Sequence, residues 1–138
     1  MSWLPGKGAA SEIAARTHAF LWAVSEPSKL PPKVRVSIQH PDTEVFVSAA
    51  SAWEIATKSR LGKLPGAGAV VTAFSALLLE LHAADLPITR ACALRAGSYP
   101  HPHADPFDRV LAAQAEIEGL MLVSKDRALR QFGVELLW

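Results

Sequence analysis

Two aspartates stand three residues apart where the sequence predicts the start of a helix. Asp105 precedes Pro106, and an N-cap aspartate followed by a proline at the first helical position is a common helix start. Asp108 falls in the first turn, and the apolar residues beyond it recur at helical spacing. Capping and the helix dipole are sufficient to explain both carboxylates, so a chemical role needs support from other residues.

A third aspartate follows a short apolar segment. Residues 119–126 read Gly-Leu-Met-Leu-Val-Ser-Lys-Asp, which is typical of a buried parallel strand with polar residues at its carboxyl end. Open α/β sheets place their sites at the carboxyl ends of their strands. We therefore expect Asp126 to lie at the same edge of the sheet as the helix start that carries Asp108.

A glutamate occupies the corresponding place after another predicted strand. Residues 45–47 form a β-rich triplet, and the helix that begins near Ser48 carries Glu54. Two structural roles also explain this side chain, namely a capping box with Ser51 and an ion pair with Lys58 one turn later. All three interpretations remain open at this point.

Glu54, Asp108 and Asp126 would together form an acidic site if the predicted elements bring them to one edge. Carboxylates gathered in this way cannot all stay ionised unless cations join them. Hard oxygen ligands suit Mg²⁺ or Mn²⁺, and such an ion activates water and stabilises the charge that develops on a phosphodiester. The residues alone therefore indicate a metal site for phosphate chemistry.

Short apolar segments alternate with helical patterns along the chain, which predicts an α/β domain with a mainly parallel sheet of about five strands. A length of 138 residues fits one domain. Residues 1–11 contain prolines and glycines without a period, so we interpret them as a loose leader and residues 12–138 as the domain.

Local patterns assign further roles. Thr17 is a candidate N-cap for a helix over residues 19–25, and Trp53 is expected in the core. A predicted helix over residues 70–82 has more leucines than one buried stripe needs, which suggests a partner. His101 and His103 could ligate a metal, although loop histidines are more often solvated.

Composition narrows the class of protein. The single Cys92 cannot form an internal disulfide and is expected to be a buried thiol. The net charge of +1 gives no general attraction for nucleic acid, so any RNA contact would depend on local Lys and Arg side chains. No segment approaches the roughly 20 apolar residues of a membrane span, so a cytoplasmic protein without membrane contact is expected.

Five segments that occur in order resemble the PIN-domain family, and within it the VapC-type toxins of bacterial toxin–antitoxin pairs. They are residues 17–22, 47–55, 61–64, 103–109 and 122–126. The resemblance implies a PIN-like three-layer fold and an endoribonuclease that uses Mg²⁺ or Mn²⁺ to cut RNA. It also implies a small VapB-like antitoxin as partner and a homodimer.

The same resemblance assigns the site. Glu54, Asp108 and Asp126 look like three metal-binding members of the family's acidic quartet, and Asp105 looks like an auxiliary carboxylate that orients the site or transfers a proton. Ser124 looks like the hydroxyl that often accompanies the last aspartate.

One position departs from the family pattern. The family's first strand typically ends in an aspartate directly before Thr-His, and here Arg16 stands before Thr17 and His18. A guanidinium stays protonated and cannot ligate a metal, so Arg16 would pair with the carboxylates and compete with the cation. A degenerate toxin, an altered start of the chain and an engineered substitution would each explain it. The sequence therefore leaves two functions open, a ribonuclease and a catalytically degenerate PIN domain that binds an antitoxin or dimerises.

Overall fold

The computed structural model describes residues 11–138; the rest of the predicted leader, residues 1–10, lies outside this part. Within residues 11–138, five parallel strands form one sheet in the order β3-β2-β1-β4-β5, which confirms the predicted parallel sheet. The strands are β1 (Ser11–Ala15), β2 (Thr43–Ser48), β3 (Ala83–Leu86), β4 (Met121–Val123) and β5 (Leu136–Leu137).

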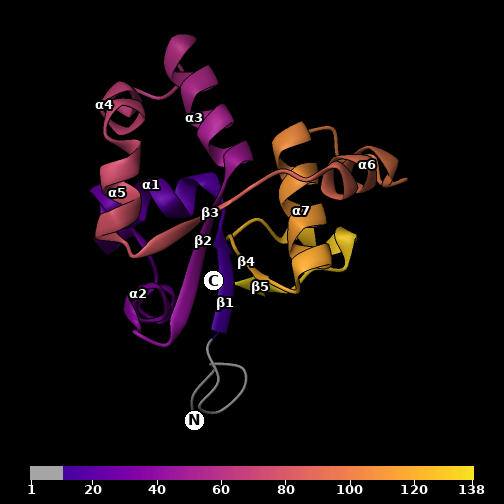
Figure 1. Cartoon of the computed structure of the whole chain (residues 1–138), viewed down its shortest axis with the longest axis horizontal. Coiled ribbons are helices and arrows are strands. Elements are labelled where there is room, and N and C mark those ends of the chain that lie inside the picture. The colour runs from indigo at the N-terminus through magenta and orange to yellow at the C-terminus, as the bar shows by residue number, and fades with distance from the viewer. Residues whose placement is uncertain (1–10) are drawn as a thin grey trace.

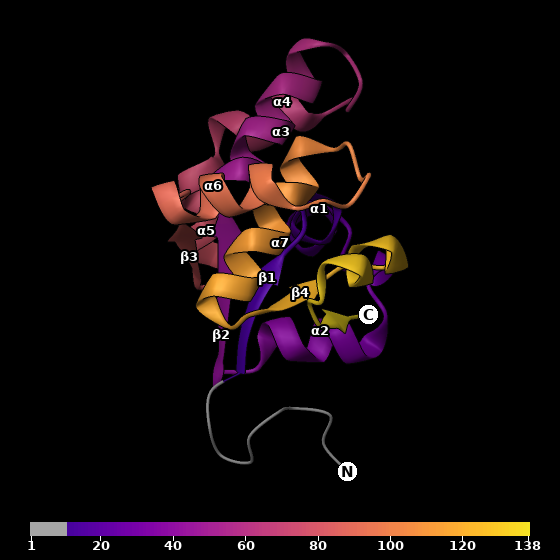
Figure 2. The same cartoon turned by 90° about the vertical axis from the view of Figure 1, so that its right-hand side faces the viewer.

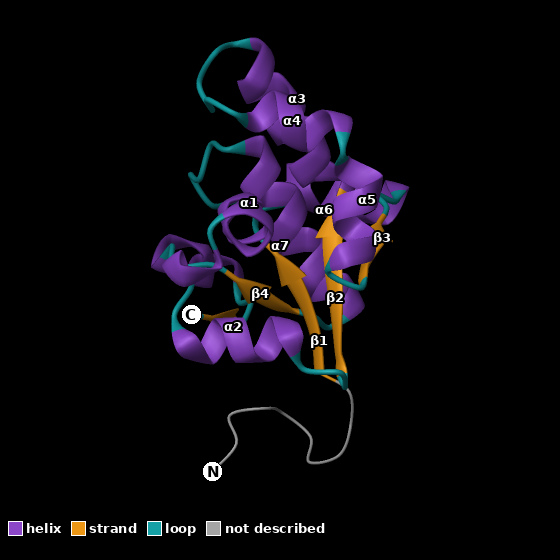
Figure 3. Ribbon diagram, turned by 90° about the vertical axis from the view of Figure 1, so that its left-hand side faces the viewer, coloured by secondary structure: helices purple, strands orange, loops and turns teal. Residues whose placement is uncertain are grey.

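Helices cover both faces of this sheet and make a three-layer α/β fold (Figure 1). Figure 3 looks onto the face covered by α1 (Thr17–Ser25), α2 (Pro32–Gln39) and α5 (Phe74–Glu80). Figure 2 looks onto the opposite face, covered by α6 (Arg90–Ser98) and α7 (Pro106–Glu118). The remaining elements are α3 (Ala49–Arg60), α4 (Ala67–Thr72) and the 3₁₀ helices η1 (Pro27–Lys29) and η2 (Arg127–Phe132).

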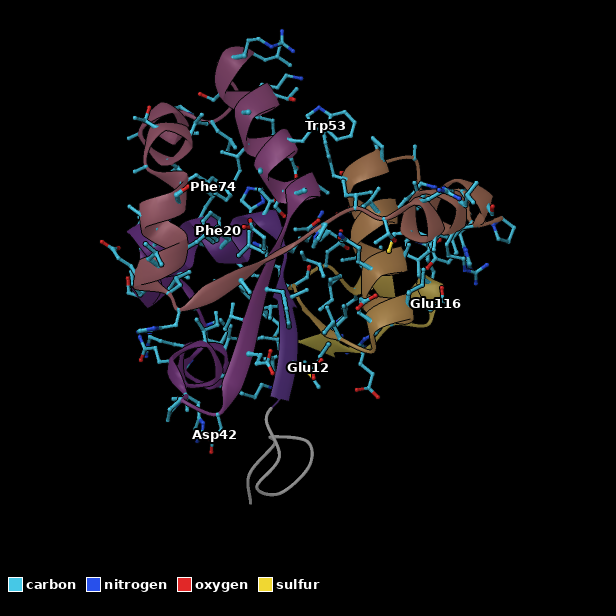
Figure 4. The ribbon with its side chains drawn as sticks, in the orientation of Figure 1. Glu12, Phe20, Asp42, Trp53, Phe74 and Glu116 are labelled. Atoms are coloured by element: carbon cyan, nitrogen blue, oxygen red, sulfur yellow. The ribbon has the colours of Figure 1, made fainter. Side chains whose placement is uncertain are left out.

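The central strand divides the core into two halves. Ile13 and Ala15 belong to the cluster under α1 and α2, whereas Ala14 between them belongs to the cluster under α7, as the period of two in a strand requires. On the first side, the rings of Phe20 and Phe74 pack 5.1 Å apart and join α1 to α5 (Figure 4). Small residues in β1 thus let helices approach the sheet from both sides.

Strand β1 extends the predicted strand at residues 13–15 by two residues at its start, so Ser11, assigned to the leader, belongs to the sheet. The strand pairs with β2 on one side and β4 on the other. The backbone N–H of Arg16 donates to the carbonyl of Val123 at 3.1 Å and continues the pairing with β4 by one residue. Arg16 is therefore held at the carboxyl end of the central strand.

Three local expectations were wrong. Thr17 does not cap α1; it is the first residue of the helix, whose N-cap is Arg16, and its hydroxyl donates to Glu54. Trp53, labelled in Figure 4, is 55% exposed, since α3 turns its other face to the core. Its ring meets that of Phe107 edge-on, with the centroids 4.7 Å apart. The single helix expected over residues 70–82 breaks at Ala73 into α4 and α5.

A helix that spans a membrane must be both long and apolar. Across residues 11–138, every helix is too short or too polar to cross a bilayer.

Candidate active site

The predicted acidic residues come together at the carboxyl edge of the sheet. Glu54 lies on α3 after β2, Asp108 lies in the first turn of α7, and Asp126 follows β4. An open cleft of about 560 Å³ lies at this edge, and its lining includes Arg16, Glu54, Lys58, Asp105, Lys125 and Asp126. Acidic and basic side chains therefore share one concave surface.

Asp108 is buried and both of its oxygens are occupied. It is 3% exposed and sits where α7 presents the positive end of its dipole. Arg16 donates to it in a bidentate fork, with Nε to Oδ1 at 2.8 Å and Nη2 to Oδ2 at 2.9 Å. On another side, Nε2 of His103 lies 2.9 Å from Oδ2. Asp108 is thus held by two basic side chains from different parts of the chain.

Glu54 is also buried and fully partnered. It is 5% exposed, and its Oε1 accepts a hydrogen bond from the hydroxyl of Thr17 at 2.5 Å. Its Oε2 accepts from Nζ of Lys58 at 2.5 Å, which confirms the ion pair expected one turn along α3. The capping box with Ser51 is not formed, because Ser48 is the N-cap of α3 and accepts from the N–H of Ala50.

Asp126 is the most accessible of the three candidate ligands, with a side chain that is 36% exposed. One oxygen, Oδ1, caps η2 by accepting from the N–H of Ala128 at 3.0 Å. The other, Oδ2, lies 3.7 Å from Nη1 of Arg16. The buried hydroxyl of Ser124 accepts from the N–H of Asp126 at 3.0 Å and so fixes the start of this turn.

Asp105 performs the capping role that the sequence predicted. Its Oδ1 accepts from the N–H of Phe107 at 2.9 Å and from that of Asp108 at 3.3 Å. The side chain also lines the cleft, beside the residues that reach Asp108. Asp105 therefore caps α7 and also remains on the surface of the cleft where a ligand would lie.

These side chains do not fit a divalent cation in the arrangement described. Among residues 11–138, no group of three or more His, Cys, Asp or Glu side chains is placed to hold a metal ion. Arg16 binds Asp108 and approaches Asp126, and Lys58 binds Glu54. Fixed cations from the chain therefore stand beside the carboxylates expected to hold Mg²⁺ or Mn²⁺.

The remaining lining is cationic and aromatic. Burial lowers the pKa of His18, and the nearby Arg16 and Lys58 cations lower it further, which favours the neutral imidazole. Lys125 is exposed and lies over the ring of Trp22, with Nζ 5.1 Å from the ring centroid. The cleft thus offers a positive charge and an aromatic surface beside its carboxylates.

Two basic residues shape the site without having been assigned to it. His103 was considered as a loop metal ligand, but its ring contacts Asp108. Arg109 belongs to a segment that carried the family resemblance, and its guanidinium donates to four carbonyls in and before the loop ahead of α7, those of Ala96, Tyr99, His101 and His103. The position of Arg109 one residue after Asp108 was the only signal of this role in the sequence.

Comparison with known proteins places this geometry in a family. The model of the PIN domain family matches residues 17–135. Ribonuclease VapC22 from Mycobacterium tuberculosis is 32% identical over 115 residues, which cover 83% of this chain and 86% of that protein. The family match spans the segments that supply Glu54, Asp108 and Asp126.

Solved structures share the fold at low sequence identity. A chain from the crystal structure of VapBC2 from Rickettsia felis bound to a DNA fragment from their promoter has a TM-score of 0.67 and 12% identity, over 91% of this chain and 97% of that chain. A chain of FitAcB from Neisseria gonorrhoeae has a TM-score of 0.61 and 19% identity, over 91% and 96%. With the family pattern across residues 17–135 and this fold, the chain belongs to the PIN domain family and is similar, within it, to a VapC ribonuclease.

Proposed function

We propose that this protein is a VapC-type ribonuclease toxin of a toxin–antitoxin pair, and that RNA is the substrate of its cleft. One observation carries the proposal. Glu54, Asp105, Asp108 and Asp126 gather at the carboxyl edge of a parallel sheet, in a chain 32% identical to Ribonuclease VapC22. The proposed reaction is hydrolysis of an RNA phosphodiester.

The cleft has features that suit a single RNA strand. Lys125 is exposed at its rim and provides a local positive charge for a phosphate, which the small net charge of the whole protein does not. Trp22 lines the same cleft under Lys125, and its ring would be open to a stacked base once Lys125 turns from the ring to a phosphate. RNA would therefore be held by a few local contacts, and its binding would weaken as salt increases.

Mg²⁺ or Mn²⁺ is the cofactor that the family relationship suggests, with Glu54, Asp108 and Asp126 as its ligands. Such an ion would supply an activated water and stabilise charge on the phosphate. The paired state of these carboxylates does not fit it, so we assign no catalytic step to an ion here.

A small VapB-like antitoxin is the proposed protein partner, and a homodimer is the proposed assembly. Large apolar side chains exposed on the surface support both, among them Trp53, Leu61 and Leu79, which are 55%, 51% and 77% exposed. The proposed RNA substrate favours a cytoplasmic location for the pair.

A second candidate function is binding without hydrolysis. The fork between Arg16 and Asp108 favours it, because it occupies a carboxylate that metal-dependent hydrolysis would need. In that case the protein would still bind an antitoxin or dimerise but would not cut RNA.

Cleavage of labelled RNA by the purified chain tests the proposal. We expect slow cleavage with Mg²⁺ or Mn²⁺ that stops with a chelator and in Asp126→Asn, since asparagine keeps the helix cap but removes the charge. Asp42→Asn is the matched control, because Asp42 is an exposed carboxylate at the opposite end of the sheet (Figure 4). Absence of cleavage with either metal would contradict the first function, and absence of cleavage together with a tight antitoxin complex would favour the second.

A further inference from the structure

We propose that Arg16 is a built-in counter-ion, which takes the place of a divalent cation in the acidic cluster and weakens the binding of Mg²⁺ and Mn²⁺. Arg16 lies in the site of the proposed function, so any effect of Arg16 on RNA cleavage rests on that function. The effect of Arg16 on cation binding is independent of it.

The backbone fixes Arg16 at the centre of the cluster. The residue follows the central strand β1, is bonded through its N–H to Val123 on β4, and is the N-cap of α1 in extended conformation, with φ −65° and ψ 157°. The side chain therefore starts between the elements that carry the carboxylates. Only a modest part of it, 21%, is exposed.

The guanidinium links two carboxylates, as a shared cation would. Nε and Nη2 bind Asp108 on α7, and Nη1 lies 3.7 Å from Oδ2 of Asp126 after β4. An arginine fork matches a carboxylate in shape as well as in charge, and its proton is not lost at any pH at which proteins fold. A metal ion that binds Asp108 must first break this fork.

Lys58 neutralises the third carboxylate. Its ammonium binds Oε2 of Glu54, whereas the hydroxyl of Thr17 binds Oε1. Two cations of the chain therefore face three candidate metal ligands and leave one formal negative charge. A divalent ion bound to the same three carboxylates in the absence of Arg16 and Lys58 would also leave one negative charge. Arg16 and Lys58 together therefore neutralise the three carboxylates as much as a divalent ion would.

Mn²⁺ titration monitored by electron paramagnetic resonance tests this directly, with native protein, Arg16→Gln, Arg16→Lys and the control Arg90→Gln. Arg90 is exposed at the start of α6 and its loss makes the same change in net charge. We expect Arg16→Gln to bind Mn²⁺ at least about tenfold more tightly than native protein, because one close positive charge is removed. Arg16→Lys and Arg90→Gln should stay close to native.

The result that overturns the proposal is equal Mn²⁺ affinity in native protein and Arg16→Gln. If unpaired carboxylates unfold Arg16→Gln, refolding on addition of Mn²⁺, measured by circular dichroism, supports the proposal, and failure to refold overturns it. Arg16→Asp should bind more tightly still, since it adds a carboxylate. RNA binding is measured separately, so failure of the proposed function leaves these outcomes unchanged.

Discussion

Arg16 and Asp108 lie 92 positions apart in the sequence, and their side chains meet in two hydrogen bonds of 2.8 and 2.9 Å. Asp108 is almost fully buried, so removal of Arg16 leaves its charge with His103 as the remaining side-chain partner. The fork therefore joins β1 to α7 as well as shaping the site.

Loss of this ion pair should destabilise the fold. We expect Asp108→Asn to lower the free energy of unfolding by about 3 kcal/mol, and the double variant with Arg16→Gln to lose less than the two single changes combined. Urea unfolding of native protein, the two single variants and the double variant gives the coupling energy between Arg16 and Asp108. The exposed Asp42→Asn should change stability by less than about 0.5 kcal/mol. A coupling energy near zero would contradict an energetic role for the fork.

Arg109 should stabilise the loop that places His103 beside Asp108. We expect Arg109→Lys to lower the free energy of unfolding by about 3 kcal/mol, because one ammonium cannot replace a planar group that bonds four carbonyls. Amide exchange over residues 97–103 should rise more than in the central strand. Arg130→Lys, a change at an exposed arginine, is the control. Unchanged exchange in the loop would contradict this role.

Local signals in the sequence predicted much of the framework. Asp105 before Pro106 marked the start of α7, because its side chain bonds to the N–H groups two and three residues further on. The expected pairing of Arg16 with a carboxylate is also present. These features depend on short spacing or on charge, which a sequence displays directly.

Contacts between distant segments were harder to predict. The hydrogen bond from Thr17 to Glu54 spans 37 residues, and it decides that Thr17 does not cap its own helix. The exposure of Trp53 depends on which face α3 turns to the sheet. The partner of Thr17 and the exposure of Trp53 both depend on distant segments. The residues around each of them therefore favoured the commoner role, a helix cap for Thr17 and a core position for Trp53.

Tyr99 should titrate at high pH. Burial raises its pKa from 10.0 to about 12, and its hydrogen bond to Glu116 adds to the rise. Because the pKa of Tyr99 is higher in the folded state than in the unfolded state, its protonated hydroxyl stabilises the fold. This stabilisation is complete below pH 10 and is lost as pH rises towards 12.

Tyr99 is the only tyrosine, so tyrosinate absorbance follows this one group. We expect a midpoint at about 12 in the folded protein and a lower midpoint, still above 10, in Glu116→Gln, since burial remains. Circular dichroism at each pH checks that the fold persists. A native midpoint near 10 would contradict the buried, bonded state of the hydroxyl.

Trp53 should matter more for partner binding than for folding. The ring is half exposed on α3 and contacts Phe107 on α7, so its loss removes one aromatic contact, and we expect Trp53→Ala to lower the free energy of unfolding by about 1 kcal/mol. If an antitoxin covers this face, the same change should weaken the complex by at least about 2 kcal/mol, as central aromatic residues of interfaces do. Calorimetric titration with the product of the neighbouring small gene measures the affinity. Leu94→Ala, which removes a 65% exposed side chain from α6, is the matched control. An antitoxin that binds Trp53→Ala as tightly as native protein lies on another surface.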